Sequence, residues 1–170
     1  MTGKILFSLN GRNVEAFEKE TIWQVCSRLG IRIPHLCYRN ATDYAGDGNC
    51  RACVVDVEGD RTLSASCIRQ PENGMTVKTH SERAIKARAM VLELLASDQE
   101  EPEGDFKVWL DEMNVHGSRF PGARERPTDP SHTAIAVDLN KCIHCKLCVQ
   151  ACHDIQGNNC LLYTSPSPRD

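Results

Sequence analysis

The sequence predicts an α+β fold, and three observations carry that prediction. Two extended apolar segments, 4–9 and 13–17, flank the dipeptide Asn10-Gly11, which is a strong signal for a β-hairpin. A short stretch of helical periodicity follows the hairpin. Three further segments have the character of strands: 53–57, 62–67 and 75–79. This order is expected of a sheet with one helix packed across it.

The short helix is predicted by its start signal, its apolar spacing and its stop signal. Thr21 is a suitable N-cap, and Gly30 stands where a helix C-terminus favours glycine. Apolar residues recur between them at helical spacing: Ile22, Val25, Cys26 and Leu29. This places Cys26 on the buried face, so we expect it to be a core residue rather than a metal ligand.

A second, longer helix is predicted over 81–97, with Ser81 as its N-cap. Its apolar stripe comprises Ile85, Ala89, Leu92 and Ala96, with Val91 and Leu95 beside it. We interpret the basic cluster of Arg83, Lys86 and Arg88 as a solvated face, with a partner-binding patch as the alternative. The acidic segment 98–105 is interpreted as a linker, 106–114 as a short helix, and 117–132 as loop.

Composition narrows the functional classes. The 170-residue chain has a net charge of −3, which gives no indication of nucleic-acid binding. It lacks an apolar run of the ~20 residues that a transmembrane helix needs, and the apolar stretch within its first nine residues is too short for a signal peptide. Ten cysteines are present, four within 37–67 and four within 142–152. Their tight C-x2-C pairs favour metal binding over a disulfide scaffold, and we expect a reducing, cytoplasmic location.

The first cysteine group has the spacing C-x12-C-x2-C-x13-C and consists of Cys37, Cys50, Cys53 and Cys67. Four thiolates with long gaps on both sides of a C-x2-C pair are typical of a [2Fe–2S] cluster. A zinc-bound structural module is the alternative, although structural zinc sites usually present two C-x2-C pairs. Gly46 and Gly48 would let the loop turn backbone N–H groups toward the sulfurs.

The second cysteine group has the spacing C-x2-C-x2-C-x3-C and consists of Cys142, Cys145, Cys148 and Cys152. In bacterial ferredoxins the first three cysteines of such a run hold one [4Fe–4S] cluster, and the fourth ligates a second cluster. The sequence contains no second run, so we expect this two-cluster unit to be incomplete here. No catalytic triad, G-x-G-x-x-G or phosphate-binding loop is present, and we assign no catalytic residue.

The last eleven residues, 160–170 (CLLYTSPSPRD), have no relation to the preceding pattern. They match the translation of a transposase adapter used in sequencing-library preparation, and we interpret them as a scar to be excluded from fold reasoning. On this interpretation the genuine chain ends near Asn158. A natural Ser/Pro-rich tail is the alternative.

Several segments together resemble a known family: 33–40 (IPHLCYRN), 47–59 (DGNCRACVVDVEG), 64–69 (SASCIR) and 74–79 (GMTVKT). They are similar to the N-terminal [2Fe–2S] domain of three relatives: the G subunit of NADH:quinone oxidoreductase, a subunit of NAD-reducing hydrogenases, and the alpha subunit of NAD-linked formate dehydrogenases. Residues 141–157 resemble the ferredoxin segment of the same proteins. The resemblance implies a β-grasp domain at 1–80, a helical connector and linker at 81–135, and the start of a 4Fe–4S ferredoxin-type domain at 136–158.

One departure separates these relatives. The quinone oxidoreductase subunit carries an H-x3-C-x2-C-x5-C cluster motif between the two units, whereas no cysteine lies between Cys67 and Cys142 here. Segments 94–99 (LLASDQ) and 118–121 (SRFP) resemble the formate dehydrogenase most. That resemblance implies a molybdopterin cofactor in a missing C-terminal part, and diaphorase-type partner subunits that bind flavin and NAD. We therefore expect electron transfer within a formate dehydrogenase, with the hydrogenase or quinone oxidoreductase subunit as the alternative.

Overall fold

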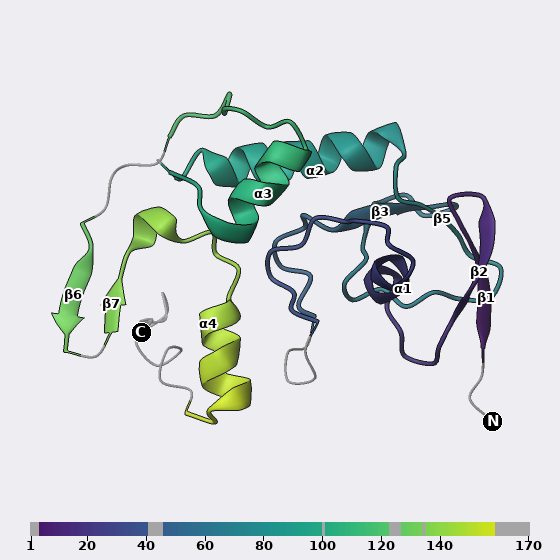
Figure 1. Ribbon diagram of the computed structural model, residues 1–170, viewed down its shortest axis with the longest axis horizontal. Coiled ribbons are helices and arrows are strands. Elements are labelled where there is room, and N and C mark those ends of the chain that lie inside the picture. The colour runs from purple at the N-terminus through teal and green to yellow at the C-terminus, as the bar shows by residue number, and fades with distance from the viewer. Residues whose placement is uncertain (1–3, 41–45, 100, 123–126, 134, 159–170) are drawn as a thin grey trace.

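A five-stranded mixed sheet forms the N-terminal half of the protein. The computed structural model describes residues 4–40, 46–99, 101–122, 127–133 and 135–158. The sheet has the order β2-β1-β5-β3-β4, from strands β1 (Ile5–Leu9), β2 (Arg12–Ala16), β3 (Val54–Val57), β4 (Ser64–Ala65) and β5 (Thr76–Lys78). Strand β1 pairs antiparallel with β2 and parallel with β5, so the last strand lies beside the first (Figure 1). The order of strands and helix predicted along the chain of this domain is confirmed.

Local sequence explains the first elements. Asn10 and Gly11 both have positive φ, 52° and 80°, as a two-residue hairpin turn of this type requires. Helix α1 (Ile22–Arg28) begins at the predicted cap, where Thr21 and Gln24 form a reciprocal capping box. Its buried side chains, Cys26 included, pack against the sheet in the main core together with Phe7, Val55 and Val77. The predicted core position of Cys26 is confirmed.

Helix α2 (Glu82–Ala96) begins at Ser81, as predicted, and crosses above β3 (Figure 1). The predicted apolar stripe is wrong at one position, since Ile85 is 41% exposed. Leu92 is buried as predicted, and the other buried side chains of this helix are those of Ala84 and Arg88. The interpretation of Arg88 as part of a solvated face is therefore also wrong, because its side chain is only 2% exposed.

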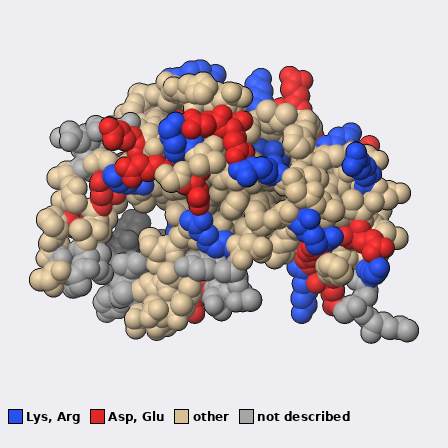
Figure 2. Space-filling model, in the orientation of Figure 1, with Lys and Arg blue, Asp and Glu red and all other residues tan. Residues whose placement is uncertain are grey.

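A second core joins α2 to α3 (Gly104–Glu112) and to the cysteine loop. Its buried members are Leu36, Ala52, Leu92, Phe106, Trp109 and Leu110, and Cys50 and Ile143 pack against them. Two ion pairs also link α3 to the segment around Cys37, Arg32–Glu112 and Arg39–Asp105. On the face shown in Figure 2, acidic and basic side chains are interspersed.

The C-terminal part contains a hairpin that sequence reasoning missed. Strand β6 (Asp129–His132) pairs with β7 (Ile135–Val137), although 117–132 was predicted as loop. Pro130 suggested that loop, but a strand with a single neighbour tolerates proline because half of its backbone N–H groups need no partner. A 3-10 helix η1 (Leu139–Lys141), helix α4 (Leu147–Gln150) and a π-helix η2 (Ala151–Ile155) follow.

The described helices include none with both the length and the apolar character to span a bilayer. The segment 160–170, interpreted above as a scar, lies outside the described residues. The domain boundaries at 80 and 135 remain predictions.

Candidate iron–sulfur centre

The first four cysteines converge from three parts of the chain. Cys37 ends the extended segment after α1, Cys50 and Cys53 lie just before β3, and Cys67 follows β4. Cys37, Cys53 and Cys67 are at most 1% exposed, and Cys50 is half-buried. Pairing of Val54 with Ala65 across β3 and β4 holds Cys53 and Cys67 near one another.

The thiols form two contacting pairs. The thiol of Cys37 interacts with that of Cys50, the thiol of Cys53 interacts with that of Cys67, and a further interaction between Cys37 and Cys67 joins the pairs. Among the residues that the structure describes, no three His, Cys, Asp or Glu side chains are arranged around a single metal ion. Two pairs of thiols fit two irons, each taking two protein ligands, so the donor set fits a [2Fe–2S] cluster.

Backbone N–H groups point toward the sulfurs. The N–H of Cys50 donates to Sγ of Cys37 at 3.3 Å, and the N–H of Ala52 donates to Sγ of Cys50. Arg51 has a φ of 59°, which turns the peptide inside the C-x2-C pair. Such N–H groups stabilise negative charge on sulfur. A left-handed backbone conformation is unfavourable for a residue other than glycine, and such strained residues are found most often at functional sites.

The two loop glycines occupy positions where a side chain would not fit. A Cβ on Gly46 would stand 2.5 Å from the carbonyl oxygen of Cys67, and one on Gly48 would stand 2.9 Å from Cδ1 of Ile68. Gly48 also has a φ of 62°. The sequence predicted a role in presenting N–H groups. The structure adds close approach of the loop to the Cys67 segment as a reason for glycine.

The four thiols of the first group oppose one another's ionisation, so positive charge is needed for all four to be thiolates. Hydrogen bonds from the thiols of Cys50 and Cys67 lower the pKa of Cys37, whereas the same contacts raise the pKa of Cys50 and of Cys67. One thiolate therefore forms readily and opposes the next. Four thiolates at this spacing require bound cations, which the irons of a [2Fe–2S] cluster would supply.

Cys26 lies outside this group. Burial raises the pKa of its thiol to about 12, so it remains neutral at physiological pH. A neutral thiol in an apolar core is a packing residue rather than a ligand.

The second cysteine group lies around the start of α4. Cys148 is on α4, Cys152 is on η2, and Cys142 and Cys145 lie in the preceding turn. His144 and Lys146 have positive φ values of 53° and 62°, as Arg51 does in the first group. Burial raises the pKa of Cys145, the N–H of Leu147 donates to its sulfur, and Cys142 and Cys148 are close enough to influence it. Ligation by this group remains a prediction.

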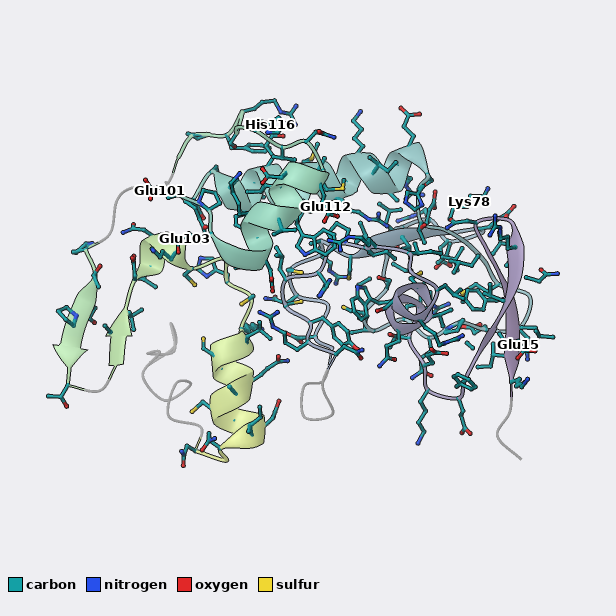
Figure 3. The ribbon with its side chains drawn as sticks, viewed as in Figure 1. Glu15, Lys78, Glu101, Glu103, Glu112 and His116 are labelled. Atoms are coloured by element: carbon teal, nitrogen blue, oxygen red, sulfur yellow. The ribbon has the colours of Figure 1, made fainter. Side chains whose placement is uncertain are left out.

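The two cysteine groups contact one another. The Nδ2 of Asn49 donates to the carbonyl oxygen of His144 at 2.6 Å, and Asp47 lies 3.9 Å from Nζ of Lys146. Lys141 pairs with Glu103 at 3.0 Å, and Figure 3 shows Glu103 beside η1. Sequence reasoning missed these contacts, of which the first two join residues almost a hundred positions apart.

Comparison with known proteins identifies the first half of the chain. Residues 3–82 match the family described as a 2Fe-2S iron-sulfur cluster binding domain. This segment is a 2Fe–2S cluster binding domain. The mixed sheet and the two thiol pairs described above agree with that match.

The relatives are subunits of oxidoreductase complexes. The chain is 36% identical over 167 residues to the NADP-reducing hydrogenase subunit HndD of Solidesulfovibrio fructosivorans, covering 89% of this chain and 28% of the relative. It is 33% identical to the mitochondrial NADH-ubiquinone oxidoreductase 78 kDa subunit of Candida albicans, covering 88% of this chain and 22% of the relative. The chain thus spans about a quarter of the length of these relatives.

A solved structure shares the fold over most of the chain. The crystal structure of an NAD+-reducing [NiFe]-hydrogenase in the H2-reduced state aligns with a TM-score of 0.79 and 26% identity, covering 91% of this chain and 68% of that chain. Relatedness to hydrogenase and quinone oxidoreductase subunits is therefore shown. The assignment to formate dehydrogenase in particular is not supported by these relatives, and the alternative fits them better.

Proposed function

We propose that this chain transfers electrons between a [2Fe–2S] cluster and a [4Fe–4S] cluster within an NAD(P)-linked oxidoreductase complex. Cys37, Cys50, Cys53 and Cys67 would hold the [2Fe–2S] cluster. Cys142, Cys145 and Cys148 would hold one [4Fe–4S] cluster, and Cys152 would ligate a second. Each cluster, when bound, would accept and release one electron at a time. The protein supplies ligands, distance and electrostatic environment.

The contact between the two cysteine groups is the observation that carries this proposal. Asn49 directly precedes Cys50, and His144 directly precedes Cys145, so the 2.6 Å hydrogen bond joins residues next to a ligand of each group. Ile143 packs in the same apolar cluster as Cys50. These contacts hold the two groups at a defined separation, which is what repeated transfer between two clusters requires.

The complex that the related proteins favour is of the hydrogenase or NADH:quinone oxidoreductase type. Both relatives described above belong to such complexes by name. The partners would then be flavin- and NAD-binding subunits. The formate dehydrogenase reading, with its molybdopterin cofactor, rests on the segments 94–99 and 118–121. A molybdopterin-binding region encoded downstream of Asn158 would support it, and a chain that ends soon after a second ferredoxin run would support the hydrogenase.

Flash photoreduction of the full-length protein, followed by freeze-quenching and EPR spectroscopy, tests the transfer itself. We expect both cluster signals, with electrons redistributing between them before the sample is frozen. In Cys145→Ser the signal of the [4Fe–4S] cluster held by Cys142, Cys145 and Cys148 should be lost while the [2Fe–2S] signal remains. Absence of a [4Fe–4S] signal in the parent, or two signals that never exchange electrons, would contradict the proposal.

A further inference from the structure

Arg88 is a buried cation on the inner face of α2. Its side chain is only 2% exposed, and it lies in one row with Ala84 and Leu92, one helical turn apart. Arginine is almost never fully buried in proteins unless it is paired with an opposite charge. The environment of Arg88 therefore needs an explanation.

The hydrogen bonds of Arg88 lead to the cysteine site. Its Nε donates to the carbonyl oxygen of Val54 at 2.8 Å, and Val54 directly follows Cys53. From the other side, Ser66 donates its hydroxyl to the carbonyl oxygen of Cys53 at 2.7 Å. The backbone that carries the Cys53 ligand is therefore fixed between Arg88 and Ser66.

The guanidinium of Arg88 has no carboxylate partner among the described residues. Its Nη2 is buried and makes no hydrogen bond within the described part of the chain. Arg83, one turn earlier on the same helix, differs because it is exposed and lies 3.7 Å from the carboxylate of Asp56. The ion pairs that the structure describes leave Arg88 unpaired.

The ionisable groups that act on Arg88 are thiols. Burial lowers the pKa of Arg88, while the thiols of Cys53 and Cys26 act in the opposite direction. Cys26 stays neutral because burial raises the pKa of its thiol to about 12. Cys53, a predicted cluster ligand, is therefore the group that can supply negative charge.

We propose that Arg88 is the internal counter-cation of the [2Fe–2S] site. A cluster with four thiolate ligands is anionic and becomes more so on reduction, so a buried guanidinium beside Cys53 stabilises the reduced form most and raises the reduction potential. Without the cluster, the same buried charge has only the Cys53 thiol to compensate it. The inference rests on the [2Fe–2S] part of the proposed function.

A potentiometric titration followed by EPR tests this role in the full chain. Arg88→Met keeps the length of the apolar stem and removes the charge. We expect the equilibrium constant for reduction of its [2Fe–2S] cluster to fall about tenfold. For a one-electron couple this is a shift of ~59 mV to lower potential. Arg88→Lys keeps the charge and should stay within twofold of the parent.

Lys86→Met is the matched control, because it removes an exposed cation from the same helix. Its potential should equal that of the parent. An unshifted Arg88→Met variant with an intact [2Fe–2S] signal would overturn the inference, and so would an Arg88→Lys variant that shifts as far as Arg88→Met. A parent protein without any [2Fe–2S] signal would instead refute the site itself, and with it the proposed function.

The metal-free protein gives a second, independent readout. If Arg88→Met fails to retain a cluster, far-UV circular dichroism of the metal-free variant decides between charge compensation and structural support. A native spectrum supports the proposal, since a buried cation without the cluster beside it should not stabilise the metal-free chain. Loss of the fold in the metal-free variant, with the metal-free parent still folded, overturns it.

Discussion

The side-chain amide of Asn49 donates a 2.6 Å hydrogen bond to the backbone carbonyl of His144. The two residues are neighbours of Cys50 and Cys145, one from each cysteine group. This single bond ties the loop of the sheet domain to the turn before α4, and the 3.9 Å approach of Asp47 to Lys146 supports it. The arrangement fixes how far apart the two proposed clusters stand.

Asn49→Ala should slow electron exchange between the clusters several-fold while leaving the [2Fe–2S] spectrum unchanged. Without the amide donor, the turn around His144 is no longer hydrogen-bonded to the loop that carries Cys50. Freeze-quench EPR of the full-length protein measures the exchange rate. Asn13→Ala, on the exposed side of β2, is the control. Equal rates in Asn49→Ala and the control would show that this contact does not matter for transfer.

Gly46→Ala should lower cluster occupancy sharply. The new methyl group would stand 2.5 Å from the carbonyl oxygen of Cys67, so the backbone next to a ligand must move. Iron content after anaerobic purification reports the effect. Gly59→Ala is the control, since its φ of 89° brings a strain of about 1–2 kcal/mol but its Cβ would meet nothing within 4 Å. Full occupancy in Gly46→Ala would contradict the close approach.

Cys26→Ser should affect the stability of the fold, whereas Cys50→Ser should affect the cluster. Burying a hydroxyl in place of the neutral Cys26 thiol should cost about 1–3 kcal/mol of stability and leave the [2Fe–2S] spectrum intact. Cys50→Ser removes a predicted ligand and should abolish that spectrum. Visible absorption and urea unfolding separate the two outcomes. Bleaching in Cys26→Ser with the fold retained would mean that the ligand assignment is wrong.

Glu20→Gln should remove an acid-sensitive part of the stability. Partial burial acts to raise the pKa of Glu20, but hydrogen bonds from Arg28 and from the N–H of Phe17 outweigh it, and the pKa is lowered from 4.5. A lowered folded-state pKa stabilises the fold above pH 4.5, and this contribution disappears as the pH falls through the folded-state pKa.

Because Arg28 is partly in solvent, screening limits the contribution of this ion pair to about 1 kcal/mol or less at pH 7. The difference in unfolding free energy between the parent and Glu20→Gln should be constant near neutrality and shrink below pH 4.5. Urea titrations at several pH values measure it. A difference that grows on acidification would contradict the assignment.

Local signals predicted most of the sheet domain. The Asn10-Gly11 turn and the caps at Thr21 and Ser81 are each encoded within a few residues, and the structure confirms all three. The spacing of the first four cysteines likewise predicted a site that the structure brings together.

What the sequence could not predict depends on distant contacts. Arg88 stands in a run of basic residues that suggests a solvated face. Its side chain is nevertheless buried, because it donates a hydrogen bond to the carbonyl oxygen of Val54 beside the cysteine site. Ile85, which continued the apolar stripe, is 41% exposed because the helix turns its Ala84 face toward β3 instead. The bond between Asn49 and His144 leaves no periodic signal, since neither residue type indicates its partner.

Anaerobic purification of the chain, with iron, sulfide and zinc analysis and EPR after reduction, tests the central claim most directly. We predict a coloured protein with at least two iron ions in each chain and a [2Fe–2S] signal that disappears in Cys50→Ser but persists in Cys26→Ser. A colourless, EPR-silent protein that contains stoichiometric zinc would contradict the account.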